Sequence, residues 1–321
     1  MHSNRLQILA ETPRLTVHPF SEIDWPVAAG KTAVLSALLL SFMATAALLG
    51  ARAATPGEAW LPRYDLRADS RRAVPLPAAL REVSGLALDG RGRLLAHNDE
   101  NARVHVVAAE NGAILRSIPA GPRELRGDFE GIAVVGDRIF LVTSGGTLLE
   151  IVQPRAGRAA SSRQVATGLD RVCEVEGLAY DPASAALLLP CKTMFSKQLK
   201  DRLVVYAVPL ATLVLDPQPR VSVPHSELES AGVRGRFRAT AVDVHPRSGS
   251  LFVLDGRQSN IVEISADGRV LAARQLARKA HPQPEGIAFG PGLELWIADE
   301  SRRRGTLTRY RLAPAGSGDK R

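Results

Sequence analysis

The chain has 321 residues and a formal net charge of +8, with 45% hydrophobic, 23% charged and 5% aromatic residues. This length allows one or two domains, and so few aromatic side chains leave no stacking platform for single-stranded nucleic acid. The basic residues are mostly scattered, so we expect no nucleic-acid partner. We interpret the charge as a solubilising surface, with attraction to anionic envelope polymers as the alternative.

The first predicted element is an apolar segment near the N-terminus. The stretch 32–50 contains no charged residue, follows Lys31, and precedes the small residues of 51–54. This is the pattern of a secretory signal peptide, and the segment is also just long enough to cross a bilayer. We therefore expect the 1–54 extension to export the protein, as a cleaved signal peptide or as a retained anchor. The mature protein would be periplasmic or tethered to the cell membrane through 32–50.

Beyond this extension, one phrase recurs along the chain. Its copies share a small or acidic first residue, a small second residue and an apolar third residue. They are Ser84-Gly85-Leu86-Ala87, Glu130-Gly131-Ile132-Ala133, Glu176-Gly177-Leu178-Ala179, Thr240-Ala241-Val242-Asp243 and Glu285-Gly286-Ile287-Ala288. Their second residues are 46, 46, 64 and 45 residues apart. A period of this size is typical of a repeat architecture.

Each repeat has the pattern of a strand meander. In the third repeat, an apolar run at 177–180 is followed by the turn 181–184 and a second apolar run at 187–189. Short apolar runs separated by turn residues predict antiparallel strands, and a repeated meander of this length is a propeller blade. The sequence therefore predicts an all-β fold, a five-bladed β-propeller over 60–313. A sandwich is the less favoured alternative, because sandwiches do not repeat one phrase at constant spacing.

Two features of the ring remain to be placed. The last repeat offers three strands, at 285–289, 293–298 and 305–311, so we expect residues near Tyr64–Leu66 to supply the fourth by pairing with 307–312. The third repeat is longer than the others, and we assign its excess to a surface loop within 193–237 that includes 226–238. Residues 314–321 are expected to form a flexible tail.

The only two cysteines, Cys173 and Cys191, fall in the first two strands of the third repeat. A hairpin turn at 181–184 would place them nearly opposite each other. In an oxidising compartment a disulfide between them is expected, and two buried free thiols are the alternative.

Polar side chains should gather at one mouth of the central channel. The first strand of each blade lines the axis, so the first residues of the five phrases form a ring, and the second strands return to the same mouth. The candidate ligand-binding residues are Ser84, Asn98, Asp99, Ser144, Lys192, Thr240, Asp255 and Asp299.

The three remaining ring positions, Glu130, Glu176 and Glu285, are candidate metal ligands. Carboxylates that face one axis repel, which raises their pKa values. A hard cation such as calcium would relieve that repulsion. Pairing with Lys192, Arg257 or backbone N–H groups is a second arrangement, and capping of the neighbouring blade's backbone by each glutamate is a third.

Signals of catalysis are weak. The chain carries none of the common hydrolase or metalloprotease motifs. His97 lies nearest the expected mouth and could act as a general base, although a structural role is favoured. Asp255 precedes Gly256, and this pair is also typical of a simple turn. Whether the protein is an enzyme stays open.

The repeated phrases also resemble a known family when their neighbours are included. The segments 82–86, 98–100, 128–131, 173–178 and 283–287 are similar to those of the SdiA-regulated (YjiK-like) family. The resemblance covers about 80–313 and implies an exported or membrane-tethered five-bladed propeller, but no activity. The chain departs from it at 238–241, where Thr240-Ala241 replaces the usual Ser-Gly or Glu-Gly.

We therefore expect an exported propeller that binds a small ligand or an envelope protein at the carboxylate-rich mouth, with a divalent cation. One alternative is a metal-dependent hydrolase of the esterase, lactonase or phosphoesterase type. The other is a scaffold that uses its outer faces and not the channel.

Overall fold

The computed structural model describes residues 58–67, 71–121, 123–152 and 160–313, which belong to one compact unit spanning 52–321. The apolar segment 32–50 and the tail 314–321 lie outside the described residues. Within the described part of the chain, no helix has the length and hydropathy that a membrane crossing requires.

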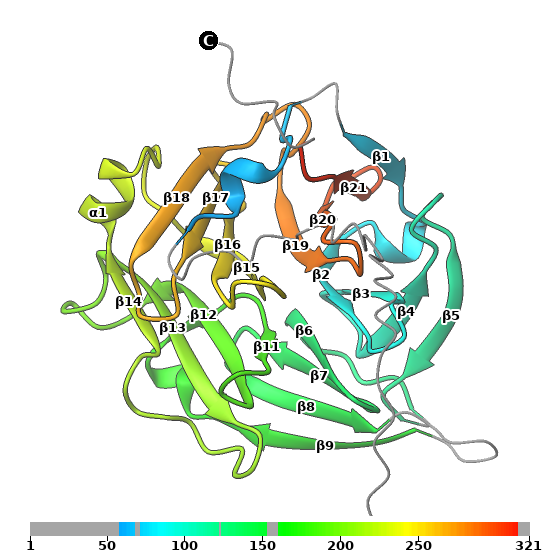
Figure 1. Ribbon diagram of the computed structural model, residues 1–321. Helices are drawn as coiled ribbons and strands as arrows, with labels where there is room; N and C mark the ends of the chain where they lie inside the picture. Colours follow the sequence, from blue (N-terminus) through cyan, green and yellow to red (C-terminus); the bar gives the residue numbers. More distant parts are fainter. Residues whose placement is uncertain (1–57, 68–70, 122, 153–159, 314–321) are drawn as a thin grey trace, which may run out of the picture. The chain divides into compact units, whose positions relative to one another are not determined.

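Five antiparallel sheets surround a central axis (Figure 1), which confirms the predicted five-bladed propeller. Each blade is a meander that runs from the axis outward. Blade I consists of β2 (Val83–Leu88), β3 (Leu94–Asn98), β4 (Arg103–Val107) and β5 (Ile114–Pro119). Blade II consists of β6 (Phe129–Val135), β7 (Arg138–Thr143), β8 (Thr147–Val152) and β9 (Ser161–Ala166). Blade III consists of β10 (Cys173–Val175), β11 (Ala179–Asp181), β12 (Ala186–Met194), β13 (Arg202–Pro209) and β14 (Val221–Pro224). Blade IV consists of β15 (Ala239–Val244), β16 (Leu251–Asp255), β17 (Asn260–Ile264) and β18 (Val270–Gln275). Blade V consists of β19 (Pro284–Phe289), β20 (Leu295–Asp299), β21 (Thr306–Tyr310) and β1 (Arg72–Pro75).

The ring closes through β1, and the expected closing segment was only partly right. β1 pairs with β21, with Arg72 opposite Arg309, whereas the 64–66 segment contributes a single bridge between Tyr64 and Leu312. The outermost strand is largely exposed, so it has little of the apolar pattern that reveals a strand. The Tyr64 side chain is instead 5% exposed and packs in the core.

The core lies between neighbouring blades. Phe140 of β7 and Leu187 of β12 share one buried cluster, and Phe252 of β16 and Phe289 of β19 share another, with ring centroids 4.9 Å apart. Each such fully buried side chain contributes about 1.5–3 kcal/mol to folding. The near-continuous burial of the inner strands follows from this, because both faces of each blade contact another blade.

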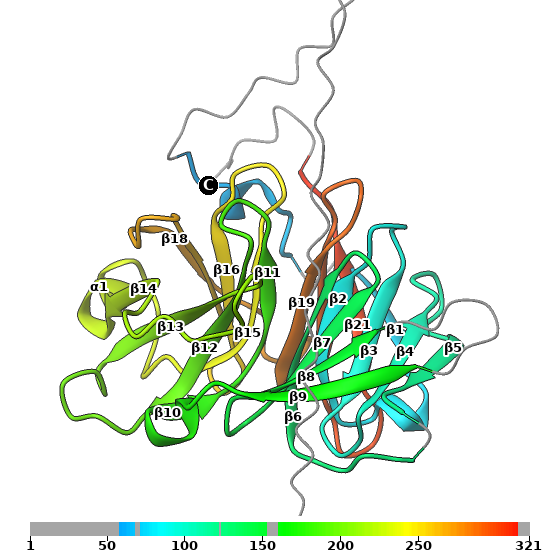
Figure 2. The same ribbon diagram turned by 90° about the horizontal axis from the view of Figure 1, so that it is seen from below.

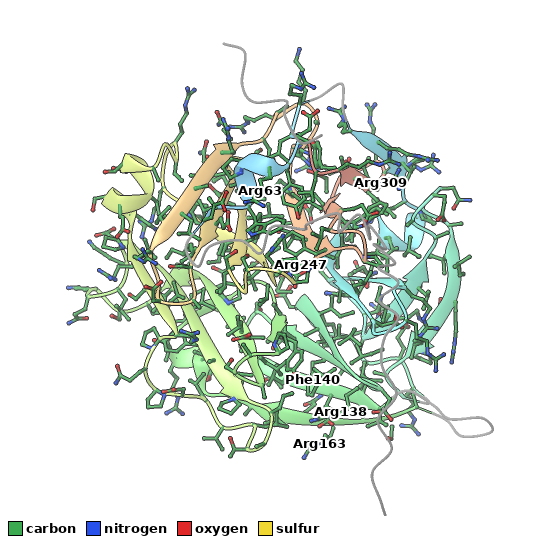
Figure 3. The ribbon with its side chains drawn as sticks, in the orientation of Figure 1. Arg63, Arg138, Phe140, Arg163, Arg247 and Arg309 are labelled. Carbon is green, nitrogen blue, oxygen red and sulfur yellow. A yellow bond between two sulfur atoms is a disulfide. The ribbon has the colours of Figure 1, made fainter. Side chains whose placement is uncertain are left out.

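The outer strands carry charge in place of apolar surface. Glu150 of β8 accepts hydrogen bonds from Arg138 Nε at 2.6 Å and Arg163 Nε at 2.5 Å, on the two flanking strands. Figure 3 shows both arginines at the outer part of blade II. These cross-strand ion pairs link the three strands β7, β8 and β9.

The long third repeat is not simply a surface loop. It contains the short helix α1 (His225–Ser230), and Leu228, Val233 and Phe237 are buried in the core between blades III and IV. The polar residues between these three apolar side chains concealed the spacing at which they face the core. Three short 3₁₀ helices complete the described structure: η1 (Leu61–Arg63), η2 (Ala78–Leu80) and η3 (Leu169–Arg171).

A disulfide joins Cys173 to Cys191, with Cα atoms 5.8 Å apart. The turn predicted that the two residues would be nearly opposite, and they lie close together but offset along the ladder. The register shifts between Glu174 and Val175, which places Cys191 opposite Val175. The bond ties β10 to β12 at the end of the blade that carries Glu174 and Lys192.

Candidate functional site

The first residue of the phrase is the extra residue of a β-bulge in four of the five blades. In blade I, Val83 pairs with Asn98 and Gly85 with His97, which leaves Ser84 unpaired. The equivalent extra residues in blades II, IV and V are Glu130, Thr240 and Glu285. A bulge bends the strand and re-aims one side chain, and bulges are frequent beside functional sites.

Blade III has a break in its inner strand where the other four blades have a bulge. Its inner strand is interrupted between β10 and β11, and the backbone N–H of Glu176 donates to the Pro190 carbonyl at 3.1 Å. The phrase therefore marks an irregularity of the inner strand in every blade, and the sequence analysis did not identify it as such.

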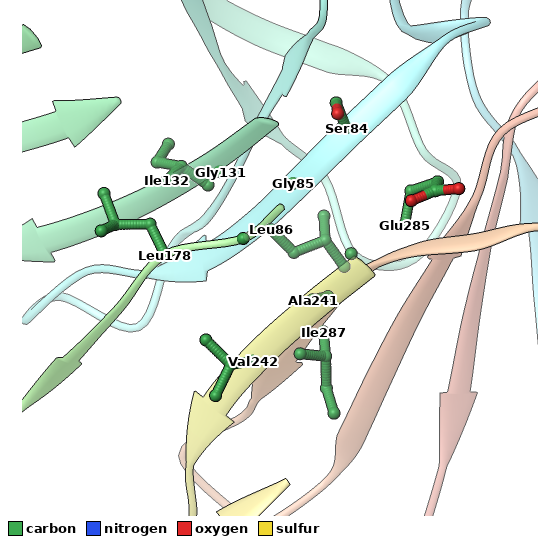
Figure 4. Close-up of a pocket in the computed structure, with 12 residues that line it drawn as sticks. Ser84, Gly85, Leu86, Gly131, Ile132, Leu178, Ala241, Val242, Glu285 and Ile287 are labelled. Atoms are coloured by element: carbon green, nitrogen blue, oxygen red, sulfur yellow. The ribbon is translucent and has the colours of Figure 1, made fainter. Parts of the chain in front are cut away.

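The second residue of the phrase brings the blades into contact at the axis. A Cβ placed on Gly131 would lie 2.4 Å from the backbone carbon of Gly177, and one on Gly286 would lie 2.9 Å from Leu86 Cγ. The space left between the inner strands is only about 10 Å³ (Figure 4), roughly the volume that one water molecule needs. Four of the five blades have glycine at this position because the backbones approach closely there, and blade IV has the small residue Ala241.

The ring residues lie on one side of this constriction and are largely buried. Ser84, Glu176, Thr240 and Glu285 are at most 9% exposed, and Glu130 is half-buried. The Ser84 hydroxyl donates to Glu130 Oε2 at 2.8 Å. We name the group formed by Ser84, Glu130, Glu176, Lys192, Thr240 and Glu285 the acidic mouth.

Lys192, at the end of β12, supplies the positive charge of the acidic mouth. Its ammonium pairs with the Glu176 carboxylate and lies 3.5 Å from Glu174 Oε1. Burial by itself would lower the pKa of Lys192, but the neighbouring carboxylates, Glu176 foremost, raise it. Lys192 therefore remains an ammonium ion at physiological pH.

The glutamates hold their protons more strongly than exposed ones do. Burial, together with the charge of Glu176, raises the pKa of Glu130 to about 8. Burial raises the pKa of Glu176 to about 7, although Lys192 opposes that rise. Burial and the nearby Glu176 raise the pKa of Glu285 well above its ordinary value. Glu130 and Glu176 therefore gain or lose their protons near neutral pH.

Two predicted ligand-binding residues are engaged inside their own blades. Asp255 accepts hydrogen bonds from Arg257 N at 3.1 Å and Asn260 Nδ2 at 2.9 Å, as a turn residue does. Asp299 Oδ2 lies 2.7 Å from His281 Nδ1, in a pair that is almost completely buried. Nothing in these contacts directs either carboxylate to the ring.

Other predicted residues lie around the mouth. Asn98 Oδ1 accepts from Asn101 N at 3.2 Å, and Ser144 Oγ donates to Asp128 Oδ2 at 2.6 Å. Burial and the charge of Glu82 raise the pKa of Asp99.

Thr240 and His97 serve the fold. The Thr240 hydroxyl donates to the Pro284 carbonyl at 2.7 Å, across to the next blade. His97 is fully buried, its Nδ1 lies 2.8 Å from the Asn98 carbonyl, and burial lowers its pKa to about 4. A neutral, enclosed imidazole packed under Gly85 supports the structural role.

A second set of charged residues was missed, although the signal was present. They precede the ring positions by two and are Glu82, Asp128, Glu174 and Arg238, whereas the fifth such position holds the uncharged Gln283. The charges of Asp128 and Glu174 raise the pKa values of Glu130 and Glu176. An acidic residue stands two positions before both Glu130 and Glu176, so this recurrence could have been read from the residues that flank the phrase.

The acidic mouth does not form a metal-coordinating cluster in this arrangement. Among the described residues, no group of three or more His, Cys, Asp or Glu side chains is placed to hold a metal ion. Glu176 is paired with Lys192 and Glu130 with Ser84. A calcium ion would therefore have to separate an existing ion pair.

Comparisons with known proteins agree with the fold. The sequence model of the SdiA-regulated family matches residues 57–303, whereas no curated protein matches the chain. Glutaminyl cyclase from Myxococcus xanthus has a similar structure, with a TM-score of 0.53 and 18% identity over 76% of this chain and 96% of that one. A gluconolactonase from Xanthomonas campestris aligns with a TM-score of 0.44 and 14% identity over 71% of this chain and 72% of that one. At 18% identity, the likeness to the glutaminyl cyclase shows a shared fold and nothing of activity.

Proposed function

This chain belongs to the SdiA-regulated family, and from that premise we propose that it is an exported binding propeller whose acidic mouth holds a cationic group of its ligand. The family by itself carries no activity, so the proposal rests on the site.

One observation carries it. Three glutamates, Glu130, Glu176 and Glu285, interact with one another around the axis, and one ammonium, that of Lys192, is paired with Glu176. Glu130 and Glu285 therefore lack a positive partner of their own among the contacts described above. A ligand ammonium between these two carboxylates would play the part that Lys192 plays for Glu176, and charge-assisted hydrogen bonds to carboxylates are strong.

The raised pKa values make the proposed binding dependent on protons. Glu130, with a pKa of about 8, is mainly neutral at pH 6 and becomes charged as the pH rises. A cation binds the charged form, so binding should release protons and tighten with rising pH. We expect the affinity to increase roughly 75-fold between pH 6 and pH 8.5, because the charged fraction of a carboxyl group with a pKa of about 8 rises from about 1% to about 75% over that range.

Isothermal titration calorimetry of the purified protein with 1,4-diaminobutane tests the proposal. The heat should depend on the ionisation enthalpy of the buffer, because protons are released. Glu130→Gln should weaken binding about tenfold by removing a charge-assisted hydrogen bond. Asp267→Asn, in a distant and exposed surface turn, should leave binding unchanged.

Calcium is the second probe. A rise of the melting temperature with calcium and no heat with the diamine would favour the metal hypothesis over the ammonium. If neither cation binds between pH 6 and 8.5, the acidic mouth is not a cation site.

Export is part of the proposal, supported by the apolar segment 32–50 and by the disulfide, since such bonds persist in oxidising compartments. Fractionation of cells that express the full chain should recover the propeller in the periplasm or the membrane. Recovery in the cytoplasm with both thiols free would overturn it.

A hydrolase remains a second candidate, favoured by Glu130 alone. A carboxyl group that titrates near neutrality suits general acid–base chemistry. A panel of esters, lactones and phosphodiesters tests this function, and turnover must disappear in Glu130→Gln to support it.

A further inference from the structure

A second cavity opens on the other side of the constriction. It measures about 550 Å³, which falls within the range of small-molecule sites. The inner strands of all five blades line it with the fifth residue counted from the start of each phrase. These residues are Leu88, Val134, Tyr180, Val244 and Phe289. We name this cavity the apolar mouth, because four of the five side chains are purely hydrocarbon.

In blades III, IV and V the loops between the first and second strands also line the apolar mouth. In Figure 2 the loop that follows β11 rises at the end away from β10. Two acidic groups of the apolar mouth are already satisfied. Asp243 accepts from Val244 N at 2.8 Å and Phe289 N at 3.1 Å. Asp181 accepts from Ala183 N at 3.0 Å and from the Ser184 hydroxyl at 2.6 Å.

Among the described residues, no carboxylate pairs with the guanidinium of Arg247. Arg247 lines the apolar mouth and is exposed, and Figure 3 labels it close to the centre of the ring. None of the ion pairs between described residues involves its guanidinium. Its neighbour His245 is fully buried and kept neutral, because burial and the charges of Arg63 and Arg247 lower its pKa to about 4. The charge available to a ligand is therefore positive.

We propose that the apolar mouth is a binding site for an amphiphilic anion, a molecule with an apolar body and one carboxylate. The apolar body fills the cavity down to the glycine constriction, and the carboxylate pairs with Arg247 at the rim. Guanidinium matches carboxylate geometry with two parallel hydrogen bonds, and the hydrocarbon walls favour the apolar body by the hydrophobic effect. This site is separate from the acidic mouth and independent of the function proposed for it.

Fluorescence titration with 11-(dansylamino)undecanoic acid, and with its primary amide as the uncharged counterpart, tests the proposal. The wild-type protein should bind the acid more tightly than the amide. Arg247→Gln should weaken the acid about tenfold, the effect of one charged hydrogen bond, and change the amide less than about twofold. Arg274→Gln, in the exposed outer strand β18, is the matched control and should change neither affinity.

A second variant tests the cavity itself. Val134→Trp adds volume at a half-buried wall position, and it should weaken the acid and the amide alike while the melting temperature stays close to that of the wild type. Equal affinity of the wild type and Arg247→Gln for the acid would overturn the anionic recognition. Unchanged binding by folded Val134→Trp, or no binding by the wild type, would overturn the site.

Discussion

The two mouths of the channel differ in chemistry, although the same five inner strands build both. The acidic mouth is titratable, and most of its residues are the extra residues of β-bulges. The apolar mouth is wide, lined by regular strand positions and has one available positive charge. Val134 is the fourth residue after Glu130 along one strand, and the constriction lies between them. A propeller strand can therefore present two unrelated surfaces, because the constriction isolates its two ends.

The largest expected effect tests that constriction. Gly131→Val places atoms within 3 Å of the blade III backbone, which cannot move aside as a flexible side chain can. We expect a loss of roughly 4 kcal/mol in unfolding free energy, measured by urea denaturation. This exceeds the usual cost of overpacking, about 1–3 kcal/mol, because the clash is with backbone atoms. Gly90→Ala, whose Cβ would meet nothing within 4 Å, is the control. If both variants are equally stable, the blades are not in contact at the axis.

The second largest effect is expected from removal of the disulfide next to the acidic mouth. The bond closes a loop of 18 residues beside Glu174 and Lys192, and replacing both cysteines with serine should cost about 3 kcal/mol. Chemical denaturation with and without reductant gives the same comparison on the wild type. Mass spectrometry that finds two free thiols in exported protein would contradict the bond.

The third prediction concerns the ion pair between Lys192 and Glu176 in the acidic mouth. Lys192→Met leaves the Glu176 carboxylate, 5% exposed, without its cation. The cost should be about 2 kcal/mol at pH 8, between the values for surface and buried pairs. It should shrink at pH 5, where Glu176 becomes neutral by protonation. Lys197→Met, at an exposed position, serves as the control, and a penalty that is independent of pH would argue against the pair.

The smallest expected effect is the pH dependence of the wild type. A carboxyl group with a raised pKa stabilises the fold fully below its unfolded pKa, and that stability is lost as the pH rises through the folded value. With Glu130 near 8 and Glu176 near 7, stability should fall between pH 5 and pH 9. Glu130→Gln should make the fall shallower by about 1 kcal/mol. Glu229→Gln, at an exposed position on α1, should show the same dependence of unfolding free energy on pH as the wild type. Identical pH dependence of all three proteins would contradict the raised pKa of Glu130.

The sequence by itself determined the number of blades and the positions that face the axis. A phrase at constant spacing, such as Glu130-Gly131 repeated as Glu176-Gly177, registers the blades without any knowledge of long-range contacts, because equivalent residues in a closed ring occupy equivalent places. A comparison of the repeats two residues before the phrase would also have shown the acidic residues Asp128 and Glu174.

Only the tertiary structure decided how those residues are used. The bulge at Glu130 depends on pairing with β7, and the pairing of Glu176 with Lys192 depends on where β12 ends. The closing strand β1 and the buried side chains of Leu228 and Phe237 were also decided by contacts between segments far apart in the chain. The apolar mouth was invisible beforehand for the same reason. The sequence of a strand shows which side chains alternate between its faces. The volume between five strands depends instead on the distances between their backbones, and the small residues at the axis set those distances only once the ring is closed.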